Sequence, residues 1–204
     1  MRETLGSELK FEVPTWNRVY TVILGLSGKI QKTGFKPDVI VGVARGGWVP
    51  ARVLSDLLSI TSVASVRAEF YMAIGEAKCE PMVTQPVSIS VAGKMVLVVD
   101  EVADTGKTLK LIKDHVVEQG AAEVKTAAVY SKPWSVARPD YYEKESSFWI
   151  VFPWEIKETI SEILRKHVEK GASFEKEKAR LVEDGIPVKL VERFLKEIAE
   201  EENC

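Results

Sequence analysis

The chain has 204 residues, 46% of them hydrophobic, which is enough for one domain with an additional segment and a sizeable core. Its net charge of −2 provides no basic field for nucleic acid, and no apolar run reaches the length of a membrane span. The two cysteines, Cys79 and Cys204, and the two histidines lack the spacing of a disulfide framework or a zinc site. Because the first ten residues are charged and do not resemble a signal peptide, we expect a cytoplasmic protein that binds neither nucleic acid nor membrane.

The hydrophobic pattern alternates between helix and strand along the first three quarters of the chain. Thr15 is expected to cap a first helix, whose apolar side would hold Trp16, Val19, Tyr20, Ile23 and Leu24. Strands are expected at residues 39–43, 62–67, 95–99, 124–130 and 147–151, and helices at 48–58 and 108–119. Residues 71–91 have no clear period and predict a long loop or a hairpin. This alternation predicts an α/β fold with a doubly wound, mostly parallel sheet, in which ligands bind beyond the carboxyl ends of the strands.

The pattern becomes helical from Trp154 onward. Apolar residues at helical spacing predict one amphipathic helix after residue 155 and a last helix after Pro187, with a charged stretch at 175–180 between them. We therefore expect a core domain at 1–155 and a helical C-terminal extension at 156–204. The extension is expected to act as a stabilising cap or an oligomer contact, and a regulatory or partner-binding role is the alternative.

The residues after the expected strand at 95–99 indicate a sugar-phosphate site. Asp100 and Glu101 end this apolar run, and vicinal carboxylates can accept hydrogen bonds from two adjacent sugar hydroxyls. The loop that follows offers backbone N–H groups, the hydroxyls of Thr105 and Thr108, and a helix N-terminus, all of which suit a phosphate. Together they describe a site for a ribose 5-phosphate.

Two other interpretations of this segment explain less. Gly106-Lys107-Thr108 looks like the end of a nucleoside-triphosphate P-loop, but that motif needs a glycine where this chain has Glu101. The carboxylate of Glu101 would also repel a polyphosphate. An ordinary helix N-cap by Asp104 or Thr105 remains open, although it gives no reason for two carboxylates at the end of a strand.

Residues 96–109 resemble the phosphoribosyl-diphosphate (PRPP) signature of type I phosphoribosyltransferases, because they combine an apolar run, an acidic pair and a Thr-Gly-x-Thr loop. Further similarities follow in the family's order from about Thr15 to Glu155 and are most like the microbial xanthine-guanine and hypoxanthine-guanine branch. The resemblance implies a purine-salvage enzyme that transfers a phosphoribosyl group from PRPP, bound with Mg²⁺, to hypoxanthine, guanine or xanthine. It also implies a homodimer or homotetramer.

The resemblance assigns the parts of PRPP to three segments. The ribose hydroxyls, and Mg²⁺ directly or through water, would contact Asp100 and Glu101. The residues implied in binding the diphosphate are Ala44, Arg45, Gly46 and Gly47. Those implied in binding the 5-phosphate are Asp104, Thr105, Gly106, Lys107 and Thr108. A plain strand-to-helix turn with a surface arginine is the alternative for the Arg-Gly-Gly loop.

The same resemblance assigns the base. Asp104 would be the catalytic residue that relays a proton at purine N7, and it favours a 6-oxopurine over adenine. Lys132 would donate to the exocyclic O6, since a cation prefers a carbonyl to an amino group. Trp149 would stack on the base, with a core tryptophan as the alternative, while Ile150 would offer its backbone and Glu155 would orient the segment or the base.

One loop and two other functions complete the expectations. Tyr71 would begin a flexible loop that closes over PRPP, although the chain has Phe70-Tyr71 where the family commonly has Ser-Tyr. A phosphoribosyltransferase for adenine or a pyrimidine base is one alternative function. A non-catalytic sensor of PRPP or a nucleotide is an alternative of another class. Residue types do not rank hypoxanthine, guanine and xanthine.

Overall fold

The computed structural model describes residues 10–71, 80–168 and 174–202. The chain divides into two compact units. The sheet unit comprises Val19–Ser147, and the terminal unit comprises Met1–Arg18 together with Phe148–Cys204. The expected boundary between residues 155 and 156 stays a prediction.

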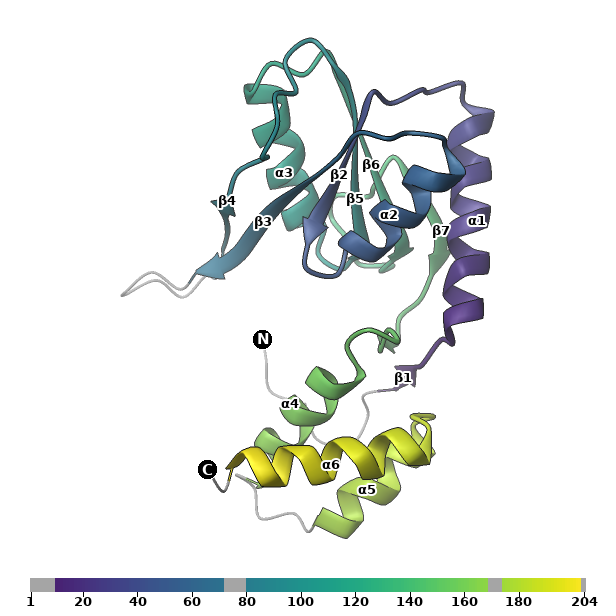
Figure 1. Cartoon of the computed structure of the whole chain (residues 1–204), viewed down its shortest axis with the longest axis vertical. Coiled ribbons are helices and arrows are strands. Elements are labelled where there is room, and N and C mark those ends of the chain that lie inside the picture. Colours follow the sequence, from purple (N-terminus) through teal and green to yellow (C-terminus); the bar gives the residue numbers. More distant parts are fainter. Residues whose placement is uncertain (1–9, 72–79, 169–173, 203–204) are drawn as a thin grey trace. The chain divides into compact units, whose positions relative to one another are not determined.

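A six-stranded sheet, in the order β4-β3-β2-β5-β6-β7, forms the sheet unit (Figure 1). The strands are β2 (Val39–Ala44), β3 (Val63–Tyr71), β4 (Glu80–Gln85), β5 (Met95–Ala103), β6 (Glu123–Ser131) and β7 (Tyr141–Glu145). Every neighbouring pair is parallel except β3 and β4, which form an antiparallel hairpin. The prediction of a mostly parallel sheet is therefore confirmed.

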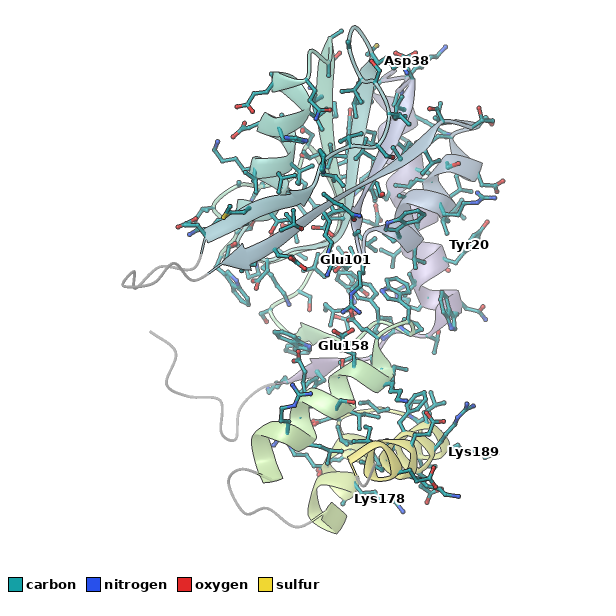
Figure 2. All side chains as sticks on the ribbon, turned by 60° about the vertical axis from the view of Figure 1, so that its left-hand side comes forward. Tyr20, Asp38, Glu101, Glu158, Lys178 and Lys189 are labelled. Carbon is teal, nitrogen blue, oxygen red and sulfur yellow. The ribbon has the colours of Figure 1, made fainter. Side chains whose placement is uncertain are left out.

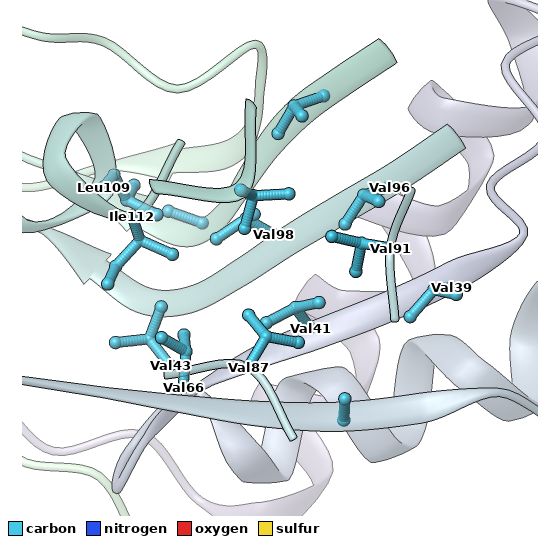
Figure 3. Packing of buried hydrophobic residues seen from close by; sticks show 14 of the residues in the cluster. Val39, Val41, Val43, Val66, Val87, Val91, Val96, Val98, Leu109 and Ile112 are labelled. Carbon is cyan, nitrogen blue, oxygen red and sulfur yellow. The ribbon is translucent and has the colours of Figure 1, made fainter. Parts of the chain in front are cut away.

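Helices cover both faces of this sheet, with α3 (Lys107–Glu118) on one face and α1 (Trp16–Lys32) and α2 (Trp48–Leu57) on the other (Figure 1). Successive strand residues point to opposite faces, so strands covered on both sides are apolar at every position. Val39, Val41, Val96 and Val98 pack in the cluster that includes Ile112 of α3, as Figure 3 shows. This buried centre fixes where the carboxyl ends of β2, β5 and β6 lie.

The helix and strand predictions held for most of the sheet unit. The α1 helix begins at Trp16, and the amide of Arg18 donates to the Thr15 side chain over 3.2 Å, which confirms the predicted cap. Of the loop or hairpin left open by the sequence, the antiparallel pairing of β3 with β4 is observed, and residues 72–79 lie outside the described part of the chain. The β5 strand is longer than expected, so Asp100 and Glu101 belong to it.

The predicted buried side of α1 was right for Val19 and Ile23 only, and one strand of this unit was not predicted. The buried side of α1 contains Val19, Val22, Ile23, Leu26 and Ile30, whereas Trp16, Tyr20 and Leu24 are half exposed. The helix carries apolar residues around more than one side, so its periodicity alone could not choose the core face. The β7 strand was not predicted, because its sequence Tyr-Tyr-Glu-Lys-Glu is polar, as is tolerated at the edge of a sheet.

The terminal unit has its own small sheet and helical core. The parallel strands β1 (Phe11–Glu12) and β8 (Trp149–Ile150) pair, and the helices are α4 (Ile156–Val168), α5 (Phe174–Glu183) and α6 (Val188–Glu202). Its buried cluster consists of Val151, Ile156, Ile160, Leu164, Leu181, Ile186, Val191, Leu195 and Ile198. The predicted helices are thus confirmed, and the charged stretch at 175–180 is also helical.

Candidate active site

The acidic pair lies near the carboxyl end of β5, in the middle of the sheet. Figure 2 shows Glu101 at the opposite end of the sheet from Asp38, which directly precedes β2. Because side chains alternate along a strand, Asp100 points to the face covered by α3 and Glu101 to the face covered by α2. Asp100 therefore lies on the same face as the loop that precedes α3, and Glu101 lies on the same face as the loop that precedes α2.

Burial makes both carboxyl groups hard to ionise. Asp100 is only 7% exposed, and this burial raises the pKa of its carboxyl group, although the hydrogen bond from the Glu101 amide (2.9 Å) opposes the rise. Burial, followed by repulsion from Asp100, raises the pKa of Glu101 well above its usual value. One oxygen of Glu101, Oε2, is buried without a hydrogen bond from the described residues. Such a pair is suited to a ligand that supplies positive charge or donors.

The Arg45-Gly46-Gly47 loop passes directly over this pair. The peptide bond between Ala44 and Arg45 is cis. A Cβ atom on Gly46 would contact the Glu101 carboxylate, and one on Gly47 would lie 2.7 Å from the Val43 carbonyl oxygen. Glycine is therefore needed at both positions for close approach of the backbone, and Arg45 is exposed at the same edge. An ordinary strand-to-helix turn would not need this contact with the carboxylate.

The expected phosphate loop connects β5 to α3. Gly106 has a φ of 78° and is the N-cap residue of α3, which has no side-chain cap. The N-cap position therefore belongs to Gly106 and not to Asp104 or Thr105, but the Thr105 hydroxyl accepts a hydrogen bond from the amide of Lys107, the first residue of the helix, over 3.3 Å. The ammonium group of Lys107 pairs with Glu80 at 2.7 Å, so β4 reaches this loop.

A turn after β6 braces the phosphate loop, and sequence reasoning found only its first residue. Lys132 is 5% exposed, and its amide donates to the Ala103 carbonyl over 3.0 Å. The Val136 amide donates to the Thr105 carbonyl over 3.1 Å. The structure thus brings the predicted Lys132 beside the predicted phosphate loop.

Trp134, in the same turn, was not predicted. Its indole Nε1 donates to Asp104 Oδ1 over 2.8 Å, and the ammonium group of Lys132 lies 5.6 Å from the centre of its ring. The signal available in the sequence was a tryptophan two residues after the lysine, at a position that does not continue the strand. Trp134 is thereby in contact with the two residues expected to recognise the base.

Trp149, Ile150 and Glu155 belong to the terminal unit. Trp149 is 48% exposed, so the alternative of a core tryptophan is wrong. The Trp149 amide donates to the carbonyl of Lys10, directly before β1, and the Val151 amide donates to the carbonyl of Glu12 in β1. Alternation along the strand therefore directs the Ile150 N–H and C=O toward the other edge of β8. The Glu155 carboxylate accepts a hydrogen bond from the Phe152 amide over 3.1 Å and holds this turn.

Three further features can be described only for the residues that the structure covers: the loop after Tyr71, clusters of metal-binding side chains, and membrane-spanning helices. Tyr71 is the last residue of β3, and residues 72–79 of the predicted flexible loop lie outside the described part of the chain. Within the described ranges, no three His, Cys, Asp or Glu side chains gather into a cluster that could hold a metal ion without a ligand's help. None of the helices within those ranges is both long and apolar enough to cross a membrane.

Comparison with known proteins agrees with this geometry. A mostly parallel sheet with helices on both faces, and with an acidic pair and two glycine-containing loops at the carboxyl ends of its strands, defines a doubly wound α/β protein that binds its ligand at this edge. The chain belongs to the phosphoribosyl transferase domain family, whose model matches residues 12–159.

Individual relatives place it near purine enzymes. It is 29% identical over 163 residues to a xanthine-guanine phosphoribosyltransferase of Cereibacter sphaeroides, and the matched region covers 76% of this chain and 93% of that protein. A purine phosphoribosyltransferase structure from Pyrococcus horikoshii is 39% identical with a TM-score of 0.64, covering 72% of this chain and 94% of that one. The structure of a hypothetical protein of Neisseria gonorrhoeae, solved with bound ppGpp, is 26% identical with a TM-score of 0.66, and the match covers 74% of this chain and 92% of that one.

Proposed function

We propose that this protein transfers the 5-phosphoribosyl group of PRPP to a 6-oxopurine, releasing diphosphate and a nucleoside monophosphate. The observation that carries the proposal is the position of Lys132, a buried cation whose amide is bonded to Ala103 at the end of the acidic strand. A fixed cation beside a PRPP site suits the carbonyl oxygen O6 of hypoxanthine, guanine or xanthine. The names of the Cereibacter and Pyrococcus relatives support a purine as the acceptor.

Three features at this edge of the sheet would hold the three parts of PRPP, of which the 5-phosphate and the diphosphate are charged and the ribose diol is neutral. The backbone N–H groups and hydroxyls of residues 104–108 would hold the 5-phosphate at the N-terminus of α3. Asp100 and Glu101 would accept the ribose hydroxyls. The amides around Gly46 and the guanidinium group of Arg45 would stabilise the negative charge that develops on the leaving diphosphate.

The acidic pair also fits Mg²⁺ bound together with PRPP. Mg²⁺ prefers carboxylate oxygens and retains several waters, and Glu101 offers a buried oxygen that has no hydrogen bond within the described residues. A cation there would offset the cost of burying two neighbouring carboxylates. When bound, Mg²⁺ would neutralise the diphosphate, while Asp100 and Glu101 hold it directly or through water.

Asp104, Trp149, Ile150 and Glu155 complete the proposed recognition of the base. The carboxylate of Asp104 would take the proton at purine N7 as C1 of the ribose is captured by the base. The half-exposed ring of Trp149 would stack on the purine, and the outward backbone groups of Ile150 would meet its edge. Glu155 would keep this segment in shape through its bond to the Phe152 amide.

Several wider properties are part of the same proposal. We infer a cytoplasmic enzyme that assembles as a homodimer or homotetramer and acts on PRPP and a purine base, with neither nucleic acid nor membrane as a partner. Residues 1–155 would form the catalytic core, with Tyr71 at the start of a closing loop. Residues 156–204 would form a helical extension.

A panel of bases tests the proposal. Purified protein with PRPP and Mg²⁺ is offered hypoxanthine, guanine, xanthine, adenine, uracil and orotate, and nucleotide formation is followed by chromatography. We expect IMP, GMP or XMP, and Lys132→Met should abolish the preference for these bases while the exposed Lys110→Met, on α3, should not. Faster turnover of adenine or a pyrimidine would contradict the choice of base, and PRPP binding without any product would indicate a sensor.

A further inference from the structure

Trp134 contacts two residues that are proposed to act on the base. Its indole N–H donates to Asp104 over 2.8 Å, a distance typical of a hydrogen bond to a charged acceptor. The face of its ring lies 5.6 Å from the ammonium nitrogen of Lys132, within the range of a cation–π interaction. One rigid side chain therefore connects the carboxylate and the cation.

We propose that Trp134 is a positioning residue that orients the Asp104 carboxylate for proton transfer with the purine. This proposal rests on the proposed role of Asp104. The Asp104 side chain is exposed, so without a partner it would sample several rotamers in water. A bond to Oδ1 selects one of them, and a fixed orientation lowers the cost of reaching the reactive geometry.

The backbone around Trp134 makes this arrangement rigid. The turn is bonded at one end to the last residue of β5, through Lys132 to Ala103 (3.0 Å), and at the other end to the phosphate loop, through Val136 to Thr105 (3.1 Å). Gly106 fits so closely under the turn that a Cβ atom there would lie 2.8 Å from the Ser135 hydroxyl oxygen. Trp134 and Asp104 are thus carried by segments that move together.

Packing alone does not explain a tryptophan at this position. Its side chain is 52% exposed, so much of its apolar surface gains nothing from burial. What the residue does provide is a donor at the distance of Asp104 and an aromatic face beside Lys132. Both contacts lead to the proposed base, which identifies a role in orienting the recognition groups.

The test compares Trp134→Phe, which keeps an aromatic face and removes the donor, with Trp134→Gln, whose amide nitrogen is as many bonds from Cβ as the indole nitrogen. In single turnovers with guanine we expect Trp134→Phe to lower the transfer rate about tenfold, which is part of the ~10²–10⁴-fold that general acid–base catalysis typically supplies. The dissociation constant of PRPP should change less than about twofold, and Gln should be at least about threefold faster than Phe. Tyr20→Phe, on the exposed side of α1, is the matched control and should behave as the unsubstituted protein.

A double-mutant cycle separates positioning from a structural effect. In the Asp104→Asn background, the Phe substitution should lower the rate less than about twofold, because the carboxylate that it orients is already gone. The inference would be overturned by any of three results. The transfer rate of Trp134→Phe could be unchanged, the loss of rate could be equal with Asp104 and with Asn at position 104, or Trp134→Gln could be no faster than Trp134→Phe. If the unsubstituted protein forms no nucleotide with any base, the proposed function fails instead, so the two failures are distinguishable.

Discussion

The carboxylate of Glu101 lies against the α-carbon of Gly46, so closely that a methyl group on the glycine would overlap it. These residues come from different strand-to-loop junctions, β2 to α2 and β5 to α3, which the central pairing of β2 with β5 brings together. The glycine loop and the acidic pair therefore form one surface. The proposed diphosphate and ribose contacts depend on this closeness.

Gly46→Ala should strongly reduce PRPP use. The new methyl group must displace either the loop or the Glu101 side chain, so we expect kcat/KM for PRPP to fall at least about tenfold, since a 1 Å misplacement in a site can cost ~10²-fold. Steady-state kinetics with varied PRPP measures it. Gly28→Ala is the matched control, because nothing lies within 4 Å of a Cβ at that helical position. It should leave kinetics unchanged and stabilise the fold by about 0.5–1 kcal/mol; wild-type kinetics in Gly46→Ala would contradict the prediction.

Glu101→Gln should raise the stability of the fold and weaken the binding of Mg²⁺ and PRPP. Burial and repulsion from Asp100 raise the pKa of Glu101, so its charge costs folding energy when no ligand is present. The amide removes the charge and can donate to Asp100, and we expect Tm to rise by about 2–4 °C, equivalent to about 1 kcal/mol. Calorimetric titration of Mg²⁺ and PRPP should show binding weakened about tenfold or more. The exposed Glu118→Gln serves as control, and a lower Tm in Glu101→Gln would refute the argument.

Trp149 and Trp154 should respond differently to truncation. Trp149 is half exposed, whereas the ring of Trp154 stacks on Phe152 at 4.6 Å and contacts Trp16 at 5.6 Å. Trp149→Ala should therefore weaken base binding about tenfold, the value of one stacking contact, with a stability loss below about 1 kcal/mol. Trp154→Ala should cost about 2 kcal/mol or more in unfolding free energy. Equal stability losses, measured by urea unfolding, would show that Trp149 is a packing residue.

The ionised carboxylate of Asp140 should make the free energy of unfolding depend on pH in the acidic range. Partial burial acts to raise its pKa, but hydrogen bonds from the Thr126 amide and hydroxyl (both 2.8 Å) and from Lys113 outweigh it, and the pKa is lowered. The stabilisation is therefore present above the ordinary aspartate pKa and is lost as pH falls through the lowered value. After allowance for solvent screening, Asp140→Asn should cost about 1 kcal/mol at pH 7.

Urea unfolding of Asp140→Asn from pH 7 down to about pH 2.5 checks this window, in which the difference from the unsubstituted protein should shrink toward zero. Asp114→Asn, which removes an exposed helical ion pair with Lys110, should show a small difference at every pH. A constant difference for Asp140→Asn would mean that its effect does not come from the carboxylate charge.

The apolar runs were enough to predict the buried strands, because a strand covered on both faces must be apolar at each position. Edge features were not: β7 is polar, and it pairs with β6 through backbone groups that carry no side-chain signal. The prediction of the buried side of α1 was partly wrong for a related reason, since Tyr20 and Leu24 are exposed although they are as apolar as the residues that face the core. Local pattern describes what a segment can bury, and the neighbouring elements decide what it does bury.

The sequence by itself determined the order of β5, the acidic pair and the phosphate loop, because these depend on residue type and spacing along one short segment. It also placed Lys132 at the end of a strand. Only the tertiary structure decided that Gly46 lies on Glu101 and that Trp134 donates to Asp104, a contact between residues 30 positions apart. Such contacts depend on strand order and on the path of turns, and the free energy that selects them is spread over the whole buried sheet.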